Sequence, residues 1–301
     1  MPPSFMQLQR FEYTPVLGWS VSRYDRFSTC KRMYYFDYYG KYAPPEQRPA
    51  IEKLRKMTSV PLETGNIVHD MIKWLLERLL ISEKPINQAK FLDCARGMTE
   101  NYCRSKQFCE VYYRSKRSVD PDEMYAGVAL CLGNFLESEK FRWITEKAVT
   151  NKADWVVEPP GYGETRIAGL KAFCKVDFLF PVDGELHILD WKTGRPDEVK
   201  HRKQLLGYAL WATHHFNVPV SSVHPVIVYL QPEYNELAVD ADQASLDALA
   251  SQVRRETAEM QSFCVDVNQN VPKEQEAFPM TERTAVCRFC NYRELCGRTV
   301  L

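Results

Sequence analysis

The sequence predicts an α/β protein, because a helix-rich first half is followed by short strands that alternate with helices. Between residues 64 and 81, apolar residues recur at spacings of three and four, which is typical of a helix with one buried face. From Ala153 onward, short runs rich in β-branched and aromatic residues replace this pattern, and a Val-Asp-Gly turn joins two of them. Of the 301 residues, 45% are apolar and 12% aromatic, which is enough for a large core.

The individual elements follow from local patterns, beginning with a first helix that Ser20 or Ser22 can cap. Helices are expected at residues 20–40, 64–81, 88–108, 122–141, 198–216 and 242–262, with a short basic helix inside a loop at 43–61. Strands are expected in ADWVVEP, TRIAGL, CKVDFLFP and ELHILDWKTG and at residues 223–230 and 234–239.

We expect these elements to form one integrated domain with five parts. The parts are an N-terminal segment with Cys30 (1–62), a helix with His69 (63–81), a helical insertion (82–145), the core (146–265) and a C-terminal cysteine segment (266–301).

Neither a membrane protein nor an exported protein fits the sequence. The N-terminal stretch MPPSFMQLQRFEY has neither the charged nor the apolar region of a signal peptide. The most apolar stretch, MIKWLLERLLI, contains three charged residues and is too short to cross a bilayer. Basic and acidic residues both number 39, although residues 1–60 hold ten basic against five acidic ones. We therefore expect a cytoplasmic protein whose basic first segment is compatible with nucleic-acid binding.

Two acidic residues and a lysine suggest a metal-dependent hydrolytic site. In HILDWKTG, Asp190 and Lys192 share one face of the expected strand. Asp177, on the other strand of the expected hairpin, can lie next to Asp190. Two carboxylates about 4 Å apart repel by roughly 4 kcal/mol at an effective dielectric near 20, so a hard cation such as Mg²⁺ or Mn²⁺ would stabilise the pair. Alone, Asp-x-Lys is typical of a strand surface, but the apolar neighbours here indicate buried strands.

Two expected helices carry further polar residues that fit the same site. His69 follows Gly65 near the start of the helix at 64–81, and Gln204 and Tyr208 lie one turn apart on the helix at 198–216. Alone, the histidine is more typical of a packed or capping residue, and the Gln-Tyr pair of ordinary helix surface.

Four of the ten cysteines suggest a second site, for a soft metal. Cys287, Cys290 and Cys296 form C-x2-C-x5-C, and Cys30 lies far upstream. Thiolates suit soft metals and clusters, and thiols are expected to stay reduced in a protein without an export signal. Zinc sites usually contain two cysteine pairs, so zinc fits less well but stays an alternative. The other cysteines are expected to act as small apolar residues: Cys94, Cys103, Cys109, Cys131, Cys174 and Cys264.

In order and spacing, these motifs resemble those of the RecB-type PD-(D/E)XK nucleases over nearly the whole chain. The motifs are GxxxH from Gly65, Asp177, Asp-x-Lys-Thr-Gly from Asp190 and Gln-x-x-x-Tyr from Gln204. The family includes the nuclease domains of the RecBCD and AddAB helicase–nucleases and the iron–sulfur CRISPR adaptation nucleases. The resemblance implies a restriction-endonuclease-like core, a central mixed sheet flanked by helices, with a helical insertion and an iron–sulfur-stapled N- and C-terminal region. In one departure, the stretch before Asp177 reads GLKAFCKVD, which places the family glycine at Gly169.

The resemblance also implies a role for each residue. As ligands of Mg²⁺ or Mn²⁺ it implies His69, Asp177, Asp190 and the backbone carbonyl of Trp191. Among the catalytic residues, Lys192 would orient the attacking water and stabilise charge on the phosphate, while Gln204 and Tyr208 would position the nucleic-acid backbone. As ligands of a 4Fe-4S cluster it implies Cys30, Cys287, Cys290 and Cys296.

We therefore expect a metal-dependent DNA nuclease, an exonuclease on single-stranded or end-bearing DNA, in DNA repair, recombination, CRISPR adaptation or phage defence. Basic residues interleaved with aromatic ones, as in RYDRFSTCKRMYYF, suit single-stranded DNA. The sequence holds no GxxxxGK[ST] phosphate-binding loop, so a helicase or a CRISPR or defence protein would supply any unwinding. The alternatives are a non-catalytic DNA-binding scaffold subunit that retains the fold and the cluster, and a thiol-redox or zinc regulatory protein.

Overall fold

The computed structural model describes residues 10–82, 84–158 and 163–298. The first nine residues, in which we expect no targeting signal, and the last residue of the run ADWVVEP lie outside the described residues. The chain divides into two compact units, which we call the sheet unit and the cysteine unit. The sheet unit comprises Met1–Glu12, Pro61–Ser105 and Asp120–Ser251, and the cysteine unit comprises Tyr13–Val60, Lys106–Val119 and Gln252–Leu301.

A mixed five-stranded sheet forms the centre of the sheet unit, with strands in the order β1-β4-β5-β6-β7. The strands are β1 (Val156–Val157), β4 (Phe178–Val182), β5 (Glu185–Lys192), β6 (Val223–Tyr229) and β7 (Asn235–Ala238). Strands β5 and β6 are parallel, and the other neighbouring pairs are antiparallel. A separate hairpin is formed by β2 (Glu164–Ile167) and β3 (Leu170–Phe173). The expected mixed sheet flanked by helices is therefore confirmed.

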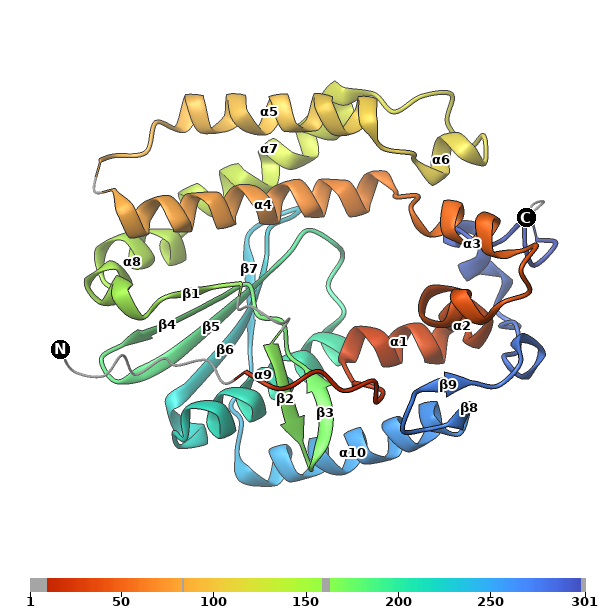
Figure 1. The fold of residues 1–301 in the computed structure, drawn as a ribbon. Helices are drawn as coiled ribbons and strands as arrows, with labels where there is room; N and C mark the ends of the chain where they lie inside the picture. The colour runs from red at the N-terminus through yellow and green to blue at the C-terminus, as the bar shows by residue number, and fades with distance from the viewer. Residues whose placement is uncertain (1–9, 83, 159–162, 299–301) are drawn as a thin grey trace. The chain divides into compact units, whose positions relative to one another are not determined.

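Helices cover both faces of this sheet, as Figure 1 shows. The elements outside the strands are α4 (Val60–Ile81), α5 (Gln88–Ser105), α7 (Pro121–Glu137), α8 (Glu139–Glu146), α9 (Glu198–Phe216), the first part of α10 (Gln243–Gln261), and the 3₁₀ helices η2 (Ala148–Asp154) and η4 (Val220–Ser222). Helices α4, α5 and α7 lie on one side of the sheet and α9 on the other. Helix α9 is the crossover that two parallel strands require, because it leaves β5 and returns the chain to β6.

Alternation along β5 determines which side chains meet which helices. The ring of Trp191 faces α7 and lies 5.0 Å from that of Phe135, measured between centroids. His187, four residues earlier on the same face, lies 4.8 Å from Trp143 of α8, measured between ring centroids. Asp190 points to the opposite face, where it accepts hydrogen bonds from side chains of α9. The helix after β5 therefore supplies two hydrogen-bond donors to Asp190, the buried carboxylate of this strand.

The cysteine unit brings together the first and last parts of the chain. Its elements are α1 (Val21–Thr29), α2 (Lys31–Tyr39), η1 (Gly40–Tyr42), α3 (Arg48–Arg55), α6 (Cys109–Tyr112), the rest of α10, β8 (Cys264–Asp266), β9 (Val271–Pro272), η5 (Gln275–Ala277) and η6 (Thr284–Phe289). Aromatic rings of α2 pack on the C-terminal segment: Tyr35 lies 4.9 Å from Phe278, and Phe36 lies 5.1 Å from Tyr292. Burial of these rings joins the two segments directly.

Two helices that were expected to be continuous are each broken. The helix at 20–40 is two helices, because Cys30 is extended (φ −162°, ψ 113°) and the backbone N–H of Arg32 bonds to Pro279 O at 3.1 Å. The helix at 122–141 breaks at Ser138, whose hydroxyl accepts from the backbone N–H of Phe141 at 3.0 Å and so caps α8. The first break depends on a hydrogen-bond acceptor that is far away in the sequence, which local patterns do not contain. The second depends on a serine that caps the helix after it.

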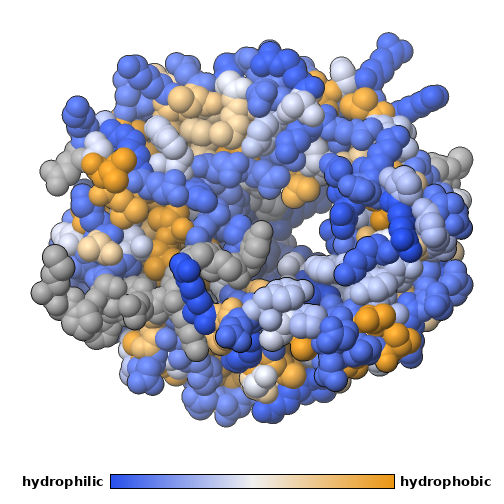
Figure 2. All heavy atoms as spheres, viewed as in Figure 1, coloured by the Kyte–Doolittle hydropathy of each residue, from blue (hydrophilic) through white to orange (hydrophobic). Residues whose placement is uncertain are grey.

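The other boundaries differ less. Helix α4 begins four residues before the expected position, and in the expected strand CKVDFLFP only the last four residues are in a strand, β4. None of the described helices is long and apolar enough to cross a membrane. On the face drawn in Figure 2, hydrophilic residues predominate and hydrophobic ones form separate groups.

Candidate functional site

The β4–β5 hairpin places Asp177 opposite Asp190. The ladder ends at the pair of Phe178 and Leu189; Asp177 directly precedes the first of these and Asp190 directly follows the second. Both carboxylates are buried, with 8% of Asp177 and 2% of Asp190 exposed. Asp177 is held by the backbone of the opposite strand, since Trp191 N donates a hydrogen bond to its Oδ2 at 2.8 Å. Strand register thus gathers two acidic side chains at the end of the hairpin.

Helix α9 holds Asp190 from the other side. Tyr208 Oη donates to Asp190 Oδ2 at 2.5 Å, and Gln204 Nε2 donates to the same oxygen at 2.9 Å. Gln204 also bonds to the hydroxyl of Tyr208, whose oxygen lies 2.8 Å from Lys175 O. Gln204 and Tyr208 therefore share one face of the helix, as expected, and both donate hydrogen bonds to the Asp190 carboxylate.

Helix α4 supplies His69, whose Nδ1 lies 3.3 Å from Asp177 Oδ2. Gly65, one turn earlier, lies so close to the end of β5 that a Cβ there would be 3.0 Å from Thr193 Oγ1. The glycine of GxxxH thus permits the close approach that brings the histidine to the carboxylate. Gly169, by contrast, lies in the turn between β2 and β3 with φ +78°, so β3 separates it from the segment that carries Asp177.

Lys192 forms an ion pair with Asp190 Oδ1 on the shared face of β5. Burial alone would lower the pKa of this lysine, but the carboxylates of Asp190 and Asp177 outweigh burial and raise it. The ammonium therefore stays charged at neutral pH. It is a fixed positive charge of the kind that stabilises a phosphate as negative charge develops on it.

The two carboxylates differ in electrostatics. Burial raises the pKa of Asp190, and repulsion from Asp177 adds to this against the opposing charge of Lys192. Burial also raises the pKa of Asp177, but the charges of His69 and Lys192 have the larger effect and lower it. The pKa of His69 is raised, since the attraction of Asp177 exceeds the effect of burial. Each of the two groups therefore favours the charged form of the other.

One pair of residues beside Lys192 was not predicted from the sequence. His201 Nδ1 and the hydroxyl of Tyr229 share a hydrogen bond of 2.7 Å, and Tyr229 pairs with Lys192 in the parallel ladder. Burial, and then the charge of Lys192, lower the pKa of His201 to about 4, so it is neutral at pH 7. The signal was present in the sequence, because His201 lies three residues before Gln204 and seven before Tyr208, on the same helix face.

The donor types fit a hard divalent cation. Asp190 Oδ1 is buried and pairs with the ammonium of Lys192. Carboxylate oxygens and an imidazole are suitable ligands for Mg²⁺ or Mn²⁺. Among the described residues, however, no three His, Cys, Asp or Glu side chains form a group that could hold a metal ion. The ligand set of His69, Asp177, Asp190 and the Trp191 carbonyl remains a prediction.

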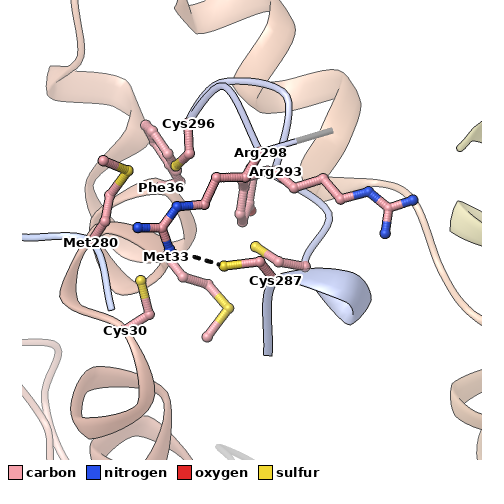
Figure 3. Close-up of a pocket in the computed structure, with 10 residues that line it drawn as sticks. Cys30, Met33, Phe36, Met280, Cys287, Arg293, Cys296 and Arg298 are labelled. Atoms are coloured by element: carbon pink, nitrogen blue, oxygen red, sulfur yellow. Dashed lines mark hydrogen bonds between the residues drawn. The ribbon is translucent and has the colours of Figure 1, made fainter. Parts of the chain in front are cut away.

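The cysteine unit gathers the four cysteines singled out by their spacing. Cys30, Cys287, Cys290 and Cys296 all line one pocket. Figure 3 shows Cys30, on the helix side, together with Cys287 and Cys296 of the C-terminal segment around this pocket. Burial raises the pKa of Cys290 to about 12, and the neighbouring thiols add to the shift. Of the four cysteines Cys287 is buried and the other three are half-buried. Sulfur donors around one pocket are of the type that an iron–sulfur cluster needs, and the 4Fe-4S ligand set remains a prediction.

The remaining six cysteines lie elsewhere. All are free thiols, with Cys131, Cys174 and Cys264 buried and Cys94 exposed. Cys174 packs near Gly207 of α9, and its thiol donates to the carbonyl of that glycine at 3.4 Å.

Comparison with known protein families finds a match to most of this chain. A sequence model described as the PD-(D/E)XK nuclease superfamily matches residues 18–297. No curated protein matches this chain. Among solved structures, the crystal structure of SSO0001 aligns with 79% of this chain and 97% of its own, at 16% sequence identity and a TM-score of 0.32. We conclude nothing from a likeness of that size.

Proposed function

Because the chain belongs to the PD-(D/E)XK nuclease superfamily, we propose that it is a metal-dependent deoxyribonuclease whose site is the Asp177–Asp190–Lys192 cluster. One observation carries the proposal. The carboxylate of Asp190 and the ammonium of Lys192 form an ion pair on one face of β5, and Asp177 lies opposite Asp190 across the hairpin. Phosphodiester hydrolysis needs such a combination of metal-binding oxygens and a fixed cation.

His69, Asp177, Asp190 and the carbonyl of Trp191 would hold Mg²⁺ or Mn²⁺. A bound divalent ion would lower the pKa of a water molecule and stabilise charge on the phosphate. Lys192 supplies a permanent positive charge next to these ligands. Gln204 and Tyr208 fix the orientation of the Asp190 carboxylate, so that a ligand oxygen is already in position before substrate binds. His69 does the same for Asp177.

For the cysteine unit we propose a structural 4Fe-4S cluster held by Cys30, Cys287, Cys290 and Cys296. The shared pocket supports it, as does the three-plus-one spacing, which suits a zinc site less well. A cluster bound there would add a cross-link between segments that aromatic packing already joins.

For the substrate we propose DNA that is single-stranded or carries free ends, cleaved exonucleolytically. Within the cysteine unit, cations lie over tyrosine rings: Arg293 is 3.7 Å from the centroid of Tyr113, and Lys53 is 4.9 Å from that of Tyr112. Side chains of these two kinds hold single strands by charge and stacking. DNA repair, recombination, CRISPR adaptation and phage defence are the settings in which a helicase or defence protein would be the partner.

The test is incubation of the full chain with end-labelled single- and double-stranded DNA and RNA, with Mg²⁺, Mn²⁺ or EDTA. We expect divalent-dependent cleavage of DNA, which Asp190→Asn and Lys192→Ala abolish while far-ultraviolet circular dichroism stays unchanged. Asp183→Asn is the matched control, because Asp183 is exposed in the turn of the same hairpin. It should cleave at the wild-type rate.

Cleavage by Asp190→Asn at the wild-type rate would exclude the assigned site. If the wild-type protein binds DNA and cleaves nothing with either metal, the scaffold alternative is the correct one. The label then distinguishes the remaining cases, because release of mononucleotides shows exonuclease action and internal fragments show endonuclease action.

A further inference from the structure

The cysteine pocket contains a positive charge among its thiols. Arg298 Nη1 donates a hydrogen bond to Cys287 Sγ at 3.2 Å. Figure 3 shows the guanidinium directed into the space around which Cys30, Cys287 and Cys296 lie. Arg298 lines the same pocket as the four cysteines. One cation thus lies among the thiols and contacts Cys287 directly.

The backbone holds Arg298 in this orientation. Gly297 has φ +65°, a conformation that favours glycine, and it reverses the chain directly after Cys296. Gly297 N then bonds to Glu294 O at 3.1 Å and Arg298 N to Arg293 O at 2.8 Å. This pair of bonds is the pattern that closes a helical turn on a left-handed glycine. Arg298 Nη1 also donates to Thr281 O at 2.7 Å, so the guanidinium is held by two acceptors, this carbonyl and Cys287 Sγ.

Arg293, a second arginine at the pocket, is oriented differently. Arg293 also lines the pocket, but its guanidinium lies 3.7 Å from the centroid of Tyr113 and donates to Arg288 O. Figure 3 shows its side chain pointing away from the cysteines. Arg298 therefore contacts a cysteine sulfur, whereas the guanidinium of Arg293, five positions earlier, lies over the ring of Tyr113.

We propose that Arg298 is the hydrogen-bond donor that holds the Cys287 thiolate and offsets its charge when the cluster is bound. The inference rests on the proposed cluster and goes beyond it, since Arg298 is not one of the ligands. Hydrogen bonds and nearby charge set the reduction potential of such clusters, and residues that orient ligands raise their affinity. Charge-assisted bonds are the stronger kind. Arg298 thus determines how long the cluster is retained and how easily it is reduced.

The test compares the full-length wild-type protein with Arg298→Met, Arg298→Lys and Arg293→Met, all purified without oxygen. Three quantities are measured: iron per chain, the rate at which visible absorbance is lost after an iron chelator is added, and the midpoint potential from a dye-equilibrated titration. We expect Arg298→Met to lose its absorbance about tenfold faster than the wild type. Its potential should shift to a more negative value, because removal of a positive charge disfavours the reduced cluster. Arg298→Lys should fall between the two, and Arg293→Met should match the wild type.

Equal rates and equal potentials for Arg298→Met and the wild type would overturn the inference while leaving the cluster intact. Should Arg298→Met not fold, Arg298→Lys decides in the same way, since it keeps the charge but loses the planar pair of donors. If Arg293→Met lost its visible absorbance as fast as Arg298→Met, the effect would come from the loss of any nearby positive charge. That result would also overturn the inference. A wild-type protein that carries zinc or no metal would overturn the cluster itself, a result that the iron content distinguishes from the others.

Discussion

Tyr208 on α9 and Asp190 on β5 share a hydrogen bond of 2.5 Å between the phenol and Oδ2, although eighteen positions separate them in sequence. The bond ties the helix that follows β5 back to the strand that carries the carboxylate. Because Tyr208 is buried and burial raises its pKa far above 10, the phenol keeps its proton and acts as a donor. The orientation of Asp190 therefore depends on a side chain that is not expected to bind metal.

Tyr208→Phe should remove this restraint while keeping the ring. A hydrogen bond to a charged group contributes about 1.5–3 kcal/mol, so the free energy of unfolding in urea should fall by roughly that amount. Cleavage of end-labelled DNA with Mg²⁺ should slow by about tenfold to a hundredfold, because ligand misplacement is costly in rate. Tyr125→Phe, which removes a hydroxyl bonded to Leu92 O at 3.2 Å in the same unit, serves as the control. Full activity of Tyr208→Phe would show that Gln204 alone suffices.

Local patterns were enough to predict the carboxylates and not enough to predict their surroundings. Asp177, Asp190 and Lys192 lie within one hairpin, where the period of two and a short turn fix both face and register. The pairing of Lys192 with Tyr229 instead depends on where the chain returns after α9, which no local pattern contains. The break at Cys30 likewise depends on a carbonyl from the other end of the chain.

The cysteines offer a second prediction. Cys290→Ser should abolish visible absorbance and reduce iron from about four atoms per chain to well under one, because one ligand of the cluster is missing. Loss of a cross-link costs about 2–4 kcal/mol, so the thermal midpoint should fall by several degrees. Cys94→Ser is the matched control, since Cys94 is exposed on α5 in the other unit. Equal iron contents in the two variants would contradict the assigned ligands.

His187 should make the sheet unit sensitive to acid. Burial, and then the charges of His224 and Lys140, lower the pKa of His187 from 6.5 to about 4. Between these two pH values the unfolded chain binds the proton more readily than the folded one, so stability falls as pH decreases from 6.5 toward 4. His187→Phe lacks this proton site. Its urea midpoint should therefore fall less than that of the wild type between pH 7 and pH 5.

The comparison at pH 7, where the histidine is neutral in both states, measures the packing effect of the substitution alone. His187 stacks on Phe180 with 5.6 Å between centroids, so phenylalanine should be tolerated there. A difference between wild type and variant that is the same at both pH values would mean that His187 has no part in the acid response.

Substitution of Gly65, the glycine of GxxxH, tests whether the close packing of α4 on the end of β5 is needed for activity. In a helix, alanine is more favourable than glycine by about 1 kcal/mol, so Gly133→Ala on α7, where a Cβ meets nothing within 4 Å, should stabilise the protein by nearly that amount. At Gly65 the same methyl group would lie 3.0 Å from Thr193 Oγ1, directly after Lys192. Thr193 must then give way by a few tenths of an ångström. We expect this shift to reach Lys192, the preceding residue, and so to disturb its alignment with His69. Gly65→Ala should therefore gain less stability than Gly133→Ala in a urea titration and cleave DNA at least about tenfold more slowly. If Gly65→Ala instead shows the full gain in stability and full activity, the close approach of α4 to β5 has no role in assembling the site.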